Sequence, residues 1–272
     1  MGEVQGARDF AGSGDAYDRF MGRYSRLLAP QFADFCDVEH GQRLLDVGCG
    51  PGAFTAVAAE RLGPGSVVAV DPSPSFVAAC RQRFPDVDVR AGAAEELPVD
   101  ETSFDRAVAQ LVIHFVSDPA RSAAEMRRAV RPGGLVGACV WDGSDGMGLL
   151  HVVSEARRAV EGASDEPEVR PFGRAGEVAD LLVGAGLEDV EEEQLGVSVR
   201  YTGFDELWDS LLEGIGPAGA YVVSLAPEAR AHYREVLLDL IGRPDGEFTL
   251  SATARAARGS VSPGPGSAAA SR

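Results

Sequence analysis

The chain has 272 residues, 45% of them hydrophobic, and a formal net charge of −17. This apolar content is enough to bury a large core, and it excludes global disorder. The excess of carboxylates argues against binding to nucleic acids or anionic membranes, and no apolar stretch is as long as a membrane span. The polar N-terminus carries no apolar signal core, so we expect a cytoplasmic protein.

The cysteines are scattered along the chain without paired spacing, at Cys36, Cys49, Cys80 and Cys139. This pattern indicates reduced thiols and no disulfide framework. The acidic run at 188–193 has no accompanying histidine, and we expect no metal site there.

Strand and helix patterns alternate through the first half of the chain. After a flexible segment at 1–14, apolar residues at helical spacing predict cap helices over 15–40, broken at Pro30. Strands are predicted at 43–47, 66–71, 86–90, 104–113 and 133–141, and helices at 53–62, 74–84 and 118–130. This alternation indicates βαβ units and a parallel sheet that is covered by helices on both faces.

The second half is less regular. We predict a helix at 173–185, an edge strand or hairpin at 186–201, helices over 204–241 with breaks at Pro217 and Pro227, and a last strand at 246–257. The low-complexity end of the chain predicts a disordered tail over 258–272. The predicted organisation is thus one domain over 15–257, in which 204–241 is an inserted lid.

A glycine-rich loop follows the first predicted strand, in LLDVGCGPGAFTAVA at 44–58. Gly48, Gly50 and Ala53 fit the G-x-G-x-x-G/A pattern of dinucleotide-binding sites, and Asp71 ends the next strand as it does there. The loop alone does not identify the ligand, because other adenosine-bearing molecules bind in the same crevice.

Two residues favour a cationic ligand. Asp46 directly precedes the turn, and its carboxylate would repel a pyrophosphate but suits the ammonium and sulfonium of S-adenosylmethionine. Pro51 removes one backbone N–H from a loop that would otherwise hold phosphate. Asp71 fits either ligand, since a carboxylate can accept two hydrogen bonds from a ribose diol.

Four motifs occur in order and carry a family resemblance: LLDVGCGPG, VVAVDPS, AGAAEELPVDETSFDRAVAQLVIHFVSDP and MRRAVRPGG. With them the chain resembles class I S-adenosylmethionine-dependent methyltransferases over about 15–142. The resemblance is to the small-molecule, type 11 branch, which includes ubiquinone/menaquinone and natural-product enzymes. It implies an α/β fold with a Rossmann-like, doubly wound, mostly parallel seven-stranded sheet and a helical substrate cap.

The resemblance also implies cofactor-binding roles. The backbone of Gly48, Cys49 and Gly50 would lie beside the amino-acid portion of the cofactor, whose ammonium Asp46 would hold. Asp71 would bind the ribose hydroxyls, with Pro72 near the adenine.

The contact to the adenine amino group departs from the family pattern. The family usually has an aspartate at position 93, where this chain has Ala93, so the backbone of Ala93 and Ala94, or Glu95, would replace it. The remaining cofactor contacts that the resemblance implies come from Gln110 and Leu111, which would line the methionine portion, and from Tyr17 and Arg23, which would close over the cofactor.

The substrate side of the site depends on less specific signals. His114 follows the fourth predicted strand and could act as a general base, although packing at a strand end is the simpler explanation and methyl transfer can proceed by proximity alone. Phe115, Trp141 and Trp208 are candidates for the substrate pocket. They indicate a small, apolar or aromatic acceptor, with the acceptor atom (O, N or C) left open and natural-product biosynthesis as one setting.

The sequence leaves two alternatives to a methyltransferase function. An NAD-dependent oxidoreductase fits the glycine loop, but a catalytic Tyr-x-x-x-Lys needs a lysine and the chain contains none. A protein of methyltransferase fold could instead keep S-adenosylmethionine as a structural ligand and catalyse cyclisation or rearrangement. In each case the expected partner is a small molecule, and the protein would be a monomer or a homodimer.

Overall fold

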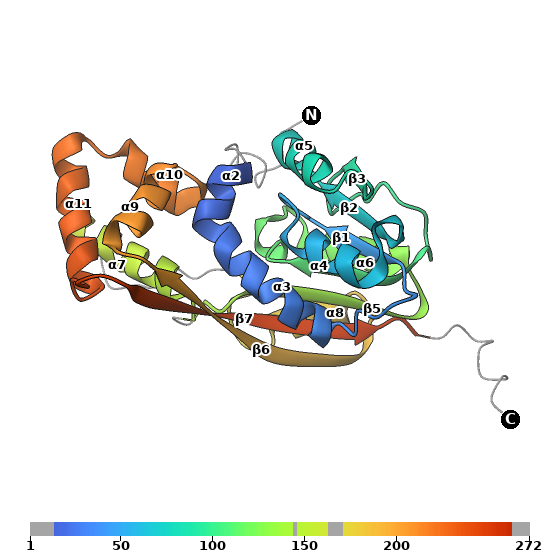
Figure 1. Ribbon diagram of the computed structural model, residues 1–272. Helices are drawn as coiled ribbons and strands as arrows, with labels where there is room; N and C mark the ends of the chain where they lie inside the picture. Colours follow the sequence, from blue (N-terminus) through green and yellow to red (C-terminus); the bar gives the residue numbers. More distant parts are fainter. Residues whose placement is uncertain (1–13, 144–145, 163–170, 263–272) are drawn as a thin grey trace, which may run out of the picture.

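The strands form one mixed sheet in a computed structural model that describes residues 14–143, 146–162 and 171–262 (Figure 1). Within these residues the order is β3-β2-β1-β4-β5-β7-β6. The strands are β1 (Leu44–Val47), β2 (Val67–Asp71), β3 (Asp88–Ala91), β4 (Phe104–Gln110), β5 (Val130–Trp141), β6 (Glu188–Tyr201) and β7 (Phe248–Ser260). β1 to β5 are parallel, and β7 runs antiparallel between β5 and β6. The predicted doubly wound, mostly parallel seven-stranded sheet is confirmed.

Helices cover both faces of the sheet, so β1 and β2 are buried along their whole length. One face packs against α3 (Arg23–Phe35), α4 (Ala53–Leu62) and α5 (Pro74–Arg83). The other packs against α6 (Pro119–Ala129) and α8 (Glu177–Gly184). Short 3₁₀ turns, η2 (Pro64–Ser66) and η3 (Ile113–Phe115), lie in the connections. Burial on both faces explains why the parallel strands are continuous apolar runs in the sequence.

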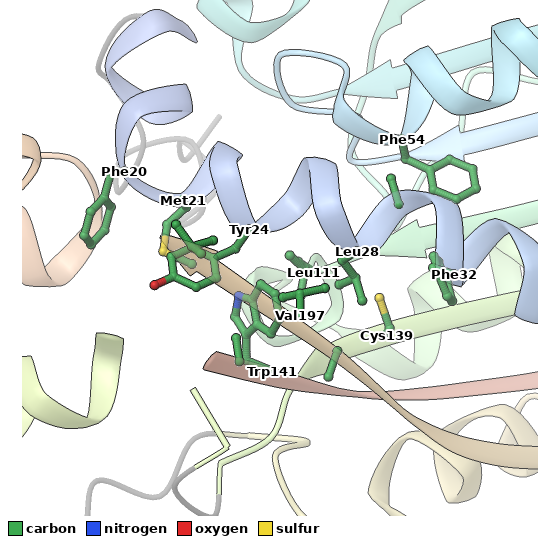
Figure 2. Packing of buried hydrophobic residues seen from close by; sticks show 14 of the residues in the cluster. Phe20, Met21, Tyr24, Leu28, Phe32, Phe54, Leu111, Cys139, Trp141 and Val197 are labelled. Atoms are coloured by element: carbon green, nitrogen blue, oxygen red, sulfur yellow. The ribbon is translucent and has the colours of Figure 1, made fainter. Parts of the chain in front are cut away.

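The N-terminal helix continues through Pro30, where the sequence predicts a break. It begins with α2 (Gly14–Tyr17), passes through a π-helical turn, η1 (Asp18–Gly22), and becomes α3. A proline inside a helix removes one backbone hydrogen bond. Here the cost is offset because Leu28 and Phe32 are fully buried on the sheet, above Leu111 and Cys139 (Figure 2).

β6 and β7 form a long antiparallel ribbon that extends beyond the rest of the sheet (Figure 1). Its far end carries α7 (Gly148–Glu161), α9 (Phe204–Leu212), α10 (Gly216–Ser224) and α11 (Pro227–Leu240). Pro217 and Pro227 lie in the first turns of α10 and α11, where the lack of an N–H costs nothing. The helical prediction for 204–241 therefore agrees with the structure, whereas α7 has no counterpart among the predicted elements.

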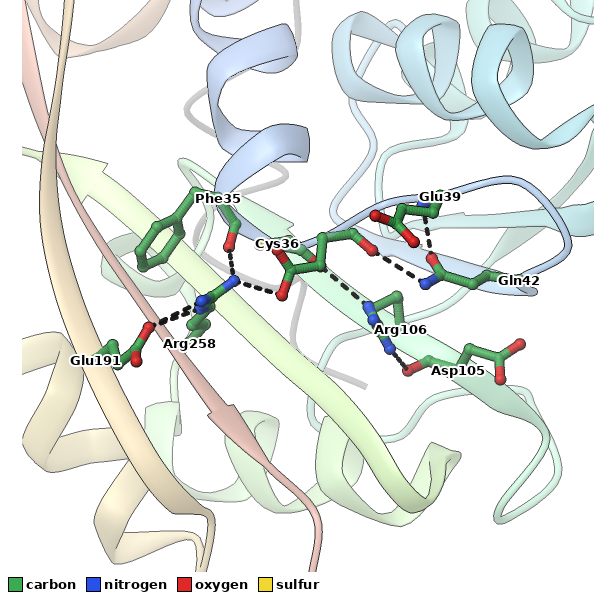
Figure 3. A network of polar contacts seen from close by, with 9 residues as sticks. Phe35, Cys36, Glu39, Gln42, Asp105, Arg106, Glu191 and Arg258 are labelled. Atoms are coloured by element: carbon green, nitrogen blue, oxygen red, sulfur yellow. Dashed lines mark hydrogen bonds and ion pairs between the residues drawn. The ribbon is translucent and has the colours of Figure 1, made fainter.

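Arg258 ties the last strand to the end of α3 (Figure 3). Its guanidinium donates to Glu191 of β6 at 2.9 Å, to Asp37 at 2.7 Å and to the Phe35 carbonyl. Residues 258–260 thus belong to β7, three residues that the sequence assigns to a disordered tail. The remainder of that predicted tail from 263, and the predicted flexible segment 1–13, lie outside the described residues.

No helix in the described ranges is both long and apolar enough to cross a membrane.

Candidate active site

A pocket of about 910 Å³, open mouth included, lies at the carboxyl ends of β1, β2 and β4. The strand order reverses between β1 and β4, and open α/β sheets bind ligands at such a switch point. The structure brings twelve of the predicted site residues together in its lining: Tyr17, Asp46, Gly48, Cys49, Gly50, Asp71, Pro72, Ala94, Glu95, Gln110, Leu111 and Phe115.

The glycine loop forms one wall of this pocket. Gly48 has a φ of +70°, and a Cβ there would lie 2.4 Å from a methyl of Val112, so only glycine fits. Gly50 has a φ of +52°, and nothing lies within 4 Å of where its Cβ would be. The loop thus presents bare backbone to open space, as close approach of a ligand requires.

Asp71 holds the loop in this shape. Its two carboxylate oxygens accept from the N–H of Gly50 and from the N–H of Ser73, each at 2.8 Å. Burial raises the pKa of Asp71 to about 6, against the lowering effect of these two hydrogen bonds. Each oxygen keeps a second lone pair, so the carboxylate can accept further hydrogen bonds from a ligand.

Asp46 is the most deeply buried acid of the site. Its side chain is 1% exposed and accepts a hydrogen bond from the Thr55 hydroxyl at 2.6 Å. Burial, and to a smaller extent the nearby negative charge of Asp71, raises the pKa of Asp46 to about 7 against the lowering effect of the hydrogen bonds from Thr55. Two buried carboxylates that have no ion pair with a cationic side chain of the described residues favour a ligand that carries positive charge.

Gln110 contributes an unsatisfied acceptor. Its Nε2 donates to the Ser25 carbonyl at 3.1 Å, which fixes the orientation of the amide, because the carbonyl of Ser25 cannot pair with another oxygen. Its Oε1 is buried and has no donor among the described residues. A buried acceptor in this condition is satisfied when a ligand brings an N–H or O–H into the pocket.

Aromatic side chains of the N-terminal helix and of α5 form another wall of the pocket. Tyr17 packs edge-on against Phe76 of α5, with ring centroids 5.5 Å apart, and both side chains line the pocket. The Tyr17 hydroxyl lies 3.5 Å from the Ser25 hydroxyl, and burial raises the pKa of Tyr17. Together these two rings cover one side of the pocket, whose mouth is open.

Arg23 is turned away from the pocket. Its guanidinium pairs with Glu206 of α9 at 2.7 Å and lies 4.4 Å from the centroid of the Tyr201 ring. The structure therefore does not support the predicted pairing of Arg23 with a cofactor carboxylate, because the guanidinium of Arg23 is already paired with Glu206.

Four other predicted residues lie outside the lining. Ala93 forms an isolated β-bridge with Glu96, and the ring of His114 lies 4.0 Å from that of Phe115, which does line the pocket. Trp141 packs edge-on against Tyr24, beneath α3 (Figure 2). Trp208 stacks on Phe204 and packs against Tyr233, inside the helices of the far end. The aromatic side chains around Trp208 thus pack against one another and not against the pocket.

Glu95 reaches the pocket but is also engaged elsewhere. Its Oε1 accepts from the N–H and the hydroxyl of Ser117, both at 2.8 Å. Only its second oxygen remains for a ligand.

Several lining residues are not predicted from the sequence as contacts of a ligand: Ser25, Pro51, Ala53, Phe54, Ser73, Phe76, Val112 and Val116. Pro51, Ser73, Val112 and Val116 lie within the four motifs, and Ala53 and Phe54 directly follow the glycine loop. Ser25 and Phe76 are different, because only the packing of α3 and α5 brings them here. No cluster of metal-ligand type is found in the described part of the chain.

Comparison with known proteins gives consistent relatives. A family model described as a methyltransferase domain matches residues 45–137. A nocamycin O-methyltransferase of Saccharothrix syringae is 31% identical over 214 residues, which cover 68% of this chain and 75% of the relative. An uncharacterized methyltransferase of Mycobacterium tuberculosis is 38% identical over 136 residues, 50% of this chain and 53% of the relative.

Solved structures share the fold. A protein of Bacillus halodurans, described as a methyltransferase, superposes with a TM-score of 0.56 at 14% identity and covers 86% of this chain and 98% of its own. The chain spans only a third to about half of the length of the curated relatives that it matches at 38% identity.

Proposed function

The chain belongs to the class I S-adenosylmethionine-dependent methyltransferases of the type 11 branch, and from this premise we propose that it transfers the methyl group of S-adenosylmethionine to a small, apolar or aromatic acceptor. The observation that carries the proposal is the pair of buried carboxylates, Asp46 and Asp71, beside bare glycine backbone at the switch point of the sheet. A cationic adenosine ligand fits this pair, and a pyrophosphate does not.

Different residues of the pocket would bind different parts of the cofactor. Asp46 would hold its ammonium, directly or through water, and Asp71 would accept the ribose hydroxyls. Pro72 and Ala94 would lie near the adenine. When bound, S-adenosylmethionine supplies a methyl group that is activated by the positive charge on sulfur.

The protein's own contribution is positioning and the exclusion of water. Methyl transfer needs an acceptor in line with the methyl group at about 3 Å, in a site that is closed to solvent. Tyr17 and Phe76 cover one side of the site, and Leu111, Val112 and Phe115 provide apolar walls. These walls support an apolar or aromatic acceptor. The nocamycin O-methyltransferase relative supports an oxygen acceptor and a natural-product substrate.

The test is calorimetric titration of the purified chain with S-adenosylmethionine, S-adenosylhomocysteine and NAD. We expect the first two to bind and NAD not to bind. Asp71→Ala should abolish this binding, and Asp180→Ala, at an exposed site on α8, should leave it intact. Binding of NAD alone would refute the proposal.

The acceptor is then sought with methyl-labelled S-adenosylmethionine and a panel of phenols and other small hydroxylated aromatics. Label that appears in an acceptor supports methyl transfer. Tight cofactor binding with no transfer, together with a rearranged or cyclised product, would instead establish the non-methylating alternative.

A further inference from the structure

Residues 14–25, here called the cap segment, cover the pocket with Tyr17 and Ser25. The next residues of the same helix are anchored firmly. Gln31 donates to the Gly196 carbonyl, and the carbonyl of Phe35 accepts from Arg258. The cap segment buries Phe20, Met21 and Tyr24 in the core. At its surface it is held by ion pairs from Asp18, Arg19 and Arg23.

One of these ion pairs reaches the glycine loop. Arg83, the last residue of α5, uses the same nitrogen, Nη1, for an ion pair with Asp18 at 2.7 Å and a hydrogen bond to the Pro51 carbonyl at 3.2 Å. A guanidinium nitrogen carries two hydrogens, so one can go to the cap segment and one to the loop. Arg83 therefore joins the two walls between which a ligand would lie.

The carboxylate of Asp18 is held in place for this contact. Its other oxygen pairs with Arg26 at 3.1 Å, and its side chain is only 17% exposed. The carboxylate folds back over Gly22, where a Cβ would lie 2.4 Å from its Oδ1. The turn between them is π-helical, a conformation that is often found at functional sites.

We propose that Arg83 is a positioning residue which couples closure of the cap segment to the conformation of the glycine loop, and so slows release of the cofactor. The inference rests on the proposed function, because it assigns the cofactor to this pocket. A ligand that packs on the loop fixes the Pro51 carbonyl. Arg83 is then oriented to hold Asp18, and Tyr17 stays over the pocket.

The chain offers a matched control. Arg61 of α4 bridges in the same way, with an ion pair to Asp34 at 2.7 Å and a hydrogen bond to the Pro30 carbonyl at 3.1 Å. Neither of these partners lines the pocket. Arg61→Met thus removes the same chemistry without touching the proposed coupling.

The experiment is surface plasmon resonance of S-adenosylhomocysteine over the immobilised full chain, which separates association from dissociation. Arg83→Met should raise the dissociation rate constant about fivefold, with little change in the association rate constant. Arg83→Lys keeps the positive charge, so its dissociation rate constant should be close to that of the wild type. Gly22→Ala, which displaces the Asp18 carboxylate and removes no charge, should reproduce the fast release. Thermal melts confirm that each variant is folded.

Two outcomes would overturn the inference: a dissociation rate in Arg83→Met equal to that of the wild type, or an equal increase in Arg61→Met. Failure of the wild-type chain to bind S-adenosylhomocysteine is a different result, and it would refute the proposed function itself.

Discussion

The Thr55 hydroxyl donates a hydrogen bond of 2.6 Å to the Asp46 carboxylate, and neither side chain is more than 1% exposed. A carboxylate in such a place resists ionisation, since it is removed from water and the hydrogen bonds from Thr55 do not replace the lost hydration. This buried acid at the end of β1 gives the site its two most direct pH-dependent consequences.

The first is a stability gain on neutralising Asp46. The pKa of Asp46 in the folded protein, about 7, lies above its ordinary value of 3.8, so the folded state holds this proton more tightly than the unfolded chain. The contribution of Asp46 to stability is therefore full below about pH 4 and is lost as the pH rises through 7. Asp46→Asn keeps an acceptor for Thr55 and should raise the free energy of unfolding of the ligand-free protein at pH 8 by about 2 kcal/mol.

Urea denaturation at pH 5 and pH 8 measures this effect. The variant should lose less stability between the two pH values than the wild type. Asp180→Asn, on the exposed face of α8, is the control and should follow the wild type. An equal pH dependence in Asp46→Asn and the wild type would contradict the prediction.

The second consequence concerns ligand binding. A cation binds more tightly to an ionised acid than to a neutral one, and burial raises the pKa of Asp46 to about 7 and that of Asp71 to about 6. Affinity for S-adenosylmethionine should therefore increase as the pH rises from 5.5 to 8, with release of protons on binding. Calorimetry in buffers of different ionisation enthalpy counts these protons. In Asp46→Asn the release should fall, and a count that is unchanged would argue against a cation next to this residue.

How much of the fold could be predicted follows from how local each signal is. The βαβ alternation and the glycine loop depend on residues that are adjacent in the sequence, and their predicted positions agree with the structure. The place of β7 between β5 and β6 depends on pairing between distant segments, which no local pattern reveals. Arg258 lies in a stretch of tail-like composition, yet its contacts to Glu191 and Asp37 place it inside a strand.

The candidate site divides in the same way. Residues of the motifs, such as Asp46 and Asp71, lie where the strand ends put them. For residues outside the motifs, tertiary packing determines whether they reach the pocket. Arg23 forms an ion pair with Glu206 instead, whereas Ser25 of α3 lines the pocket. The aromatic residues of 204–241 suggest a substrate surface by composition, but they are buried against one another.

This last point predicts a separation between stability and binding. Trp208 is buried among the helices of the far end and does not line the pocket. Trp208→Ala should lower the free energy of unfolding by about 3–5 kcal/mol and leave the affinity for S-adenosylhomocysteine unchanged. Phe76→Ala, at an aromatic residue that does line the pocket, is the matched comparison and should weaken that affinity. A weakened affinity in folded Trp208→Ala would place the far-end helices in the binding site after all.

Gln110 supplies the prediction that bears most directly on the reaction. Its Oε1 is a buried acceptor without a donor among the described residues, and leaving such a group unpaired costs about 1–3 kcal/mol. Gln110→Leu removes this group together with the hydrogen bond to Ser25, so the stability of the ligand-free protein should change by less than about 1 kcal/mol. The ligand that donates to Oε1 should bind about tenfold more weakly to this variant.

Titration with S-adenosylhomocysteine and a label-transfer assay identify that ligand. A weaker affinity for S-adenosylhomocysteine points to the cofactor's ammonium, and slower methyl transfer alone points to a hydroxyl or amine of the acceptor. Gln194→Leu, at an exposed residue of β6, is the control, and an unchanged affinity and rate in Gln110→Leu would mean that this acceptor takes no part in binding.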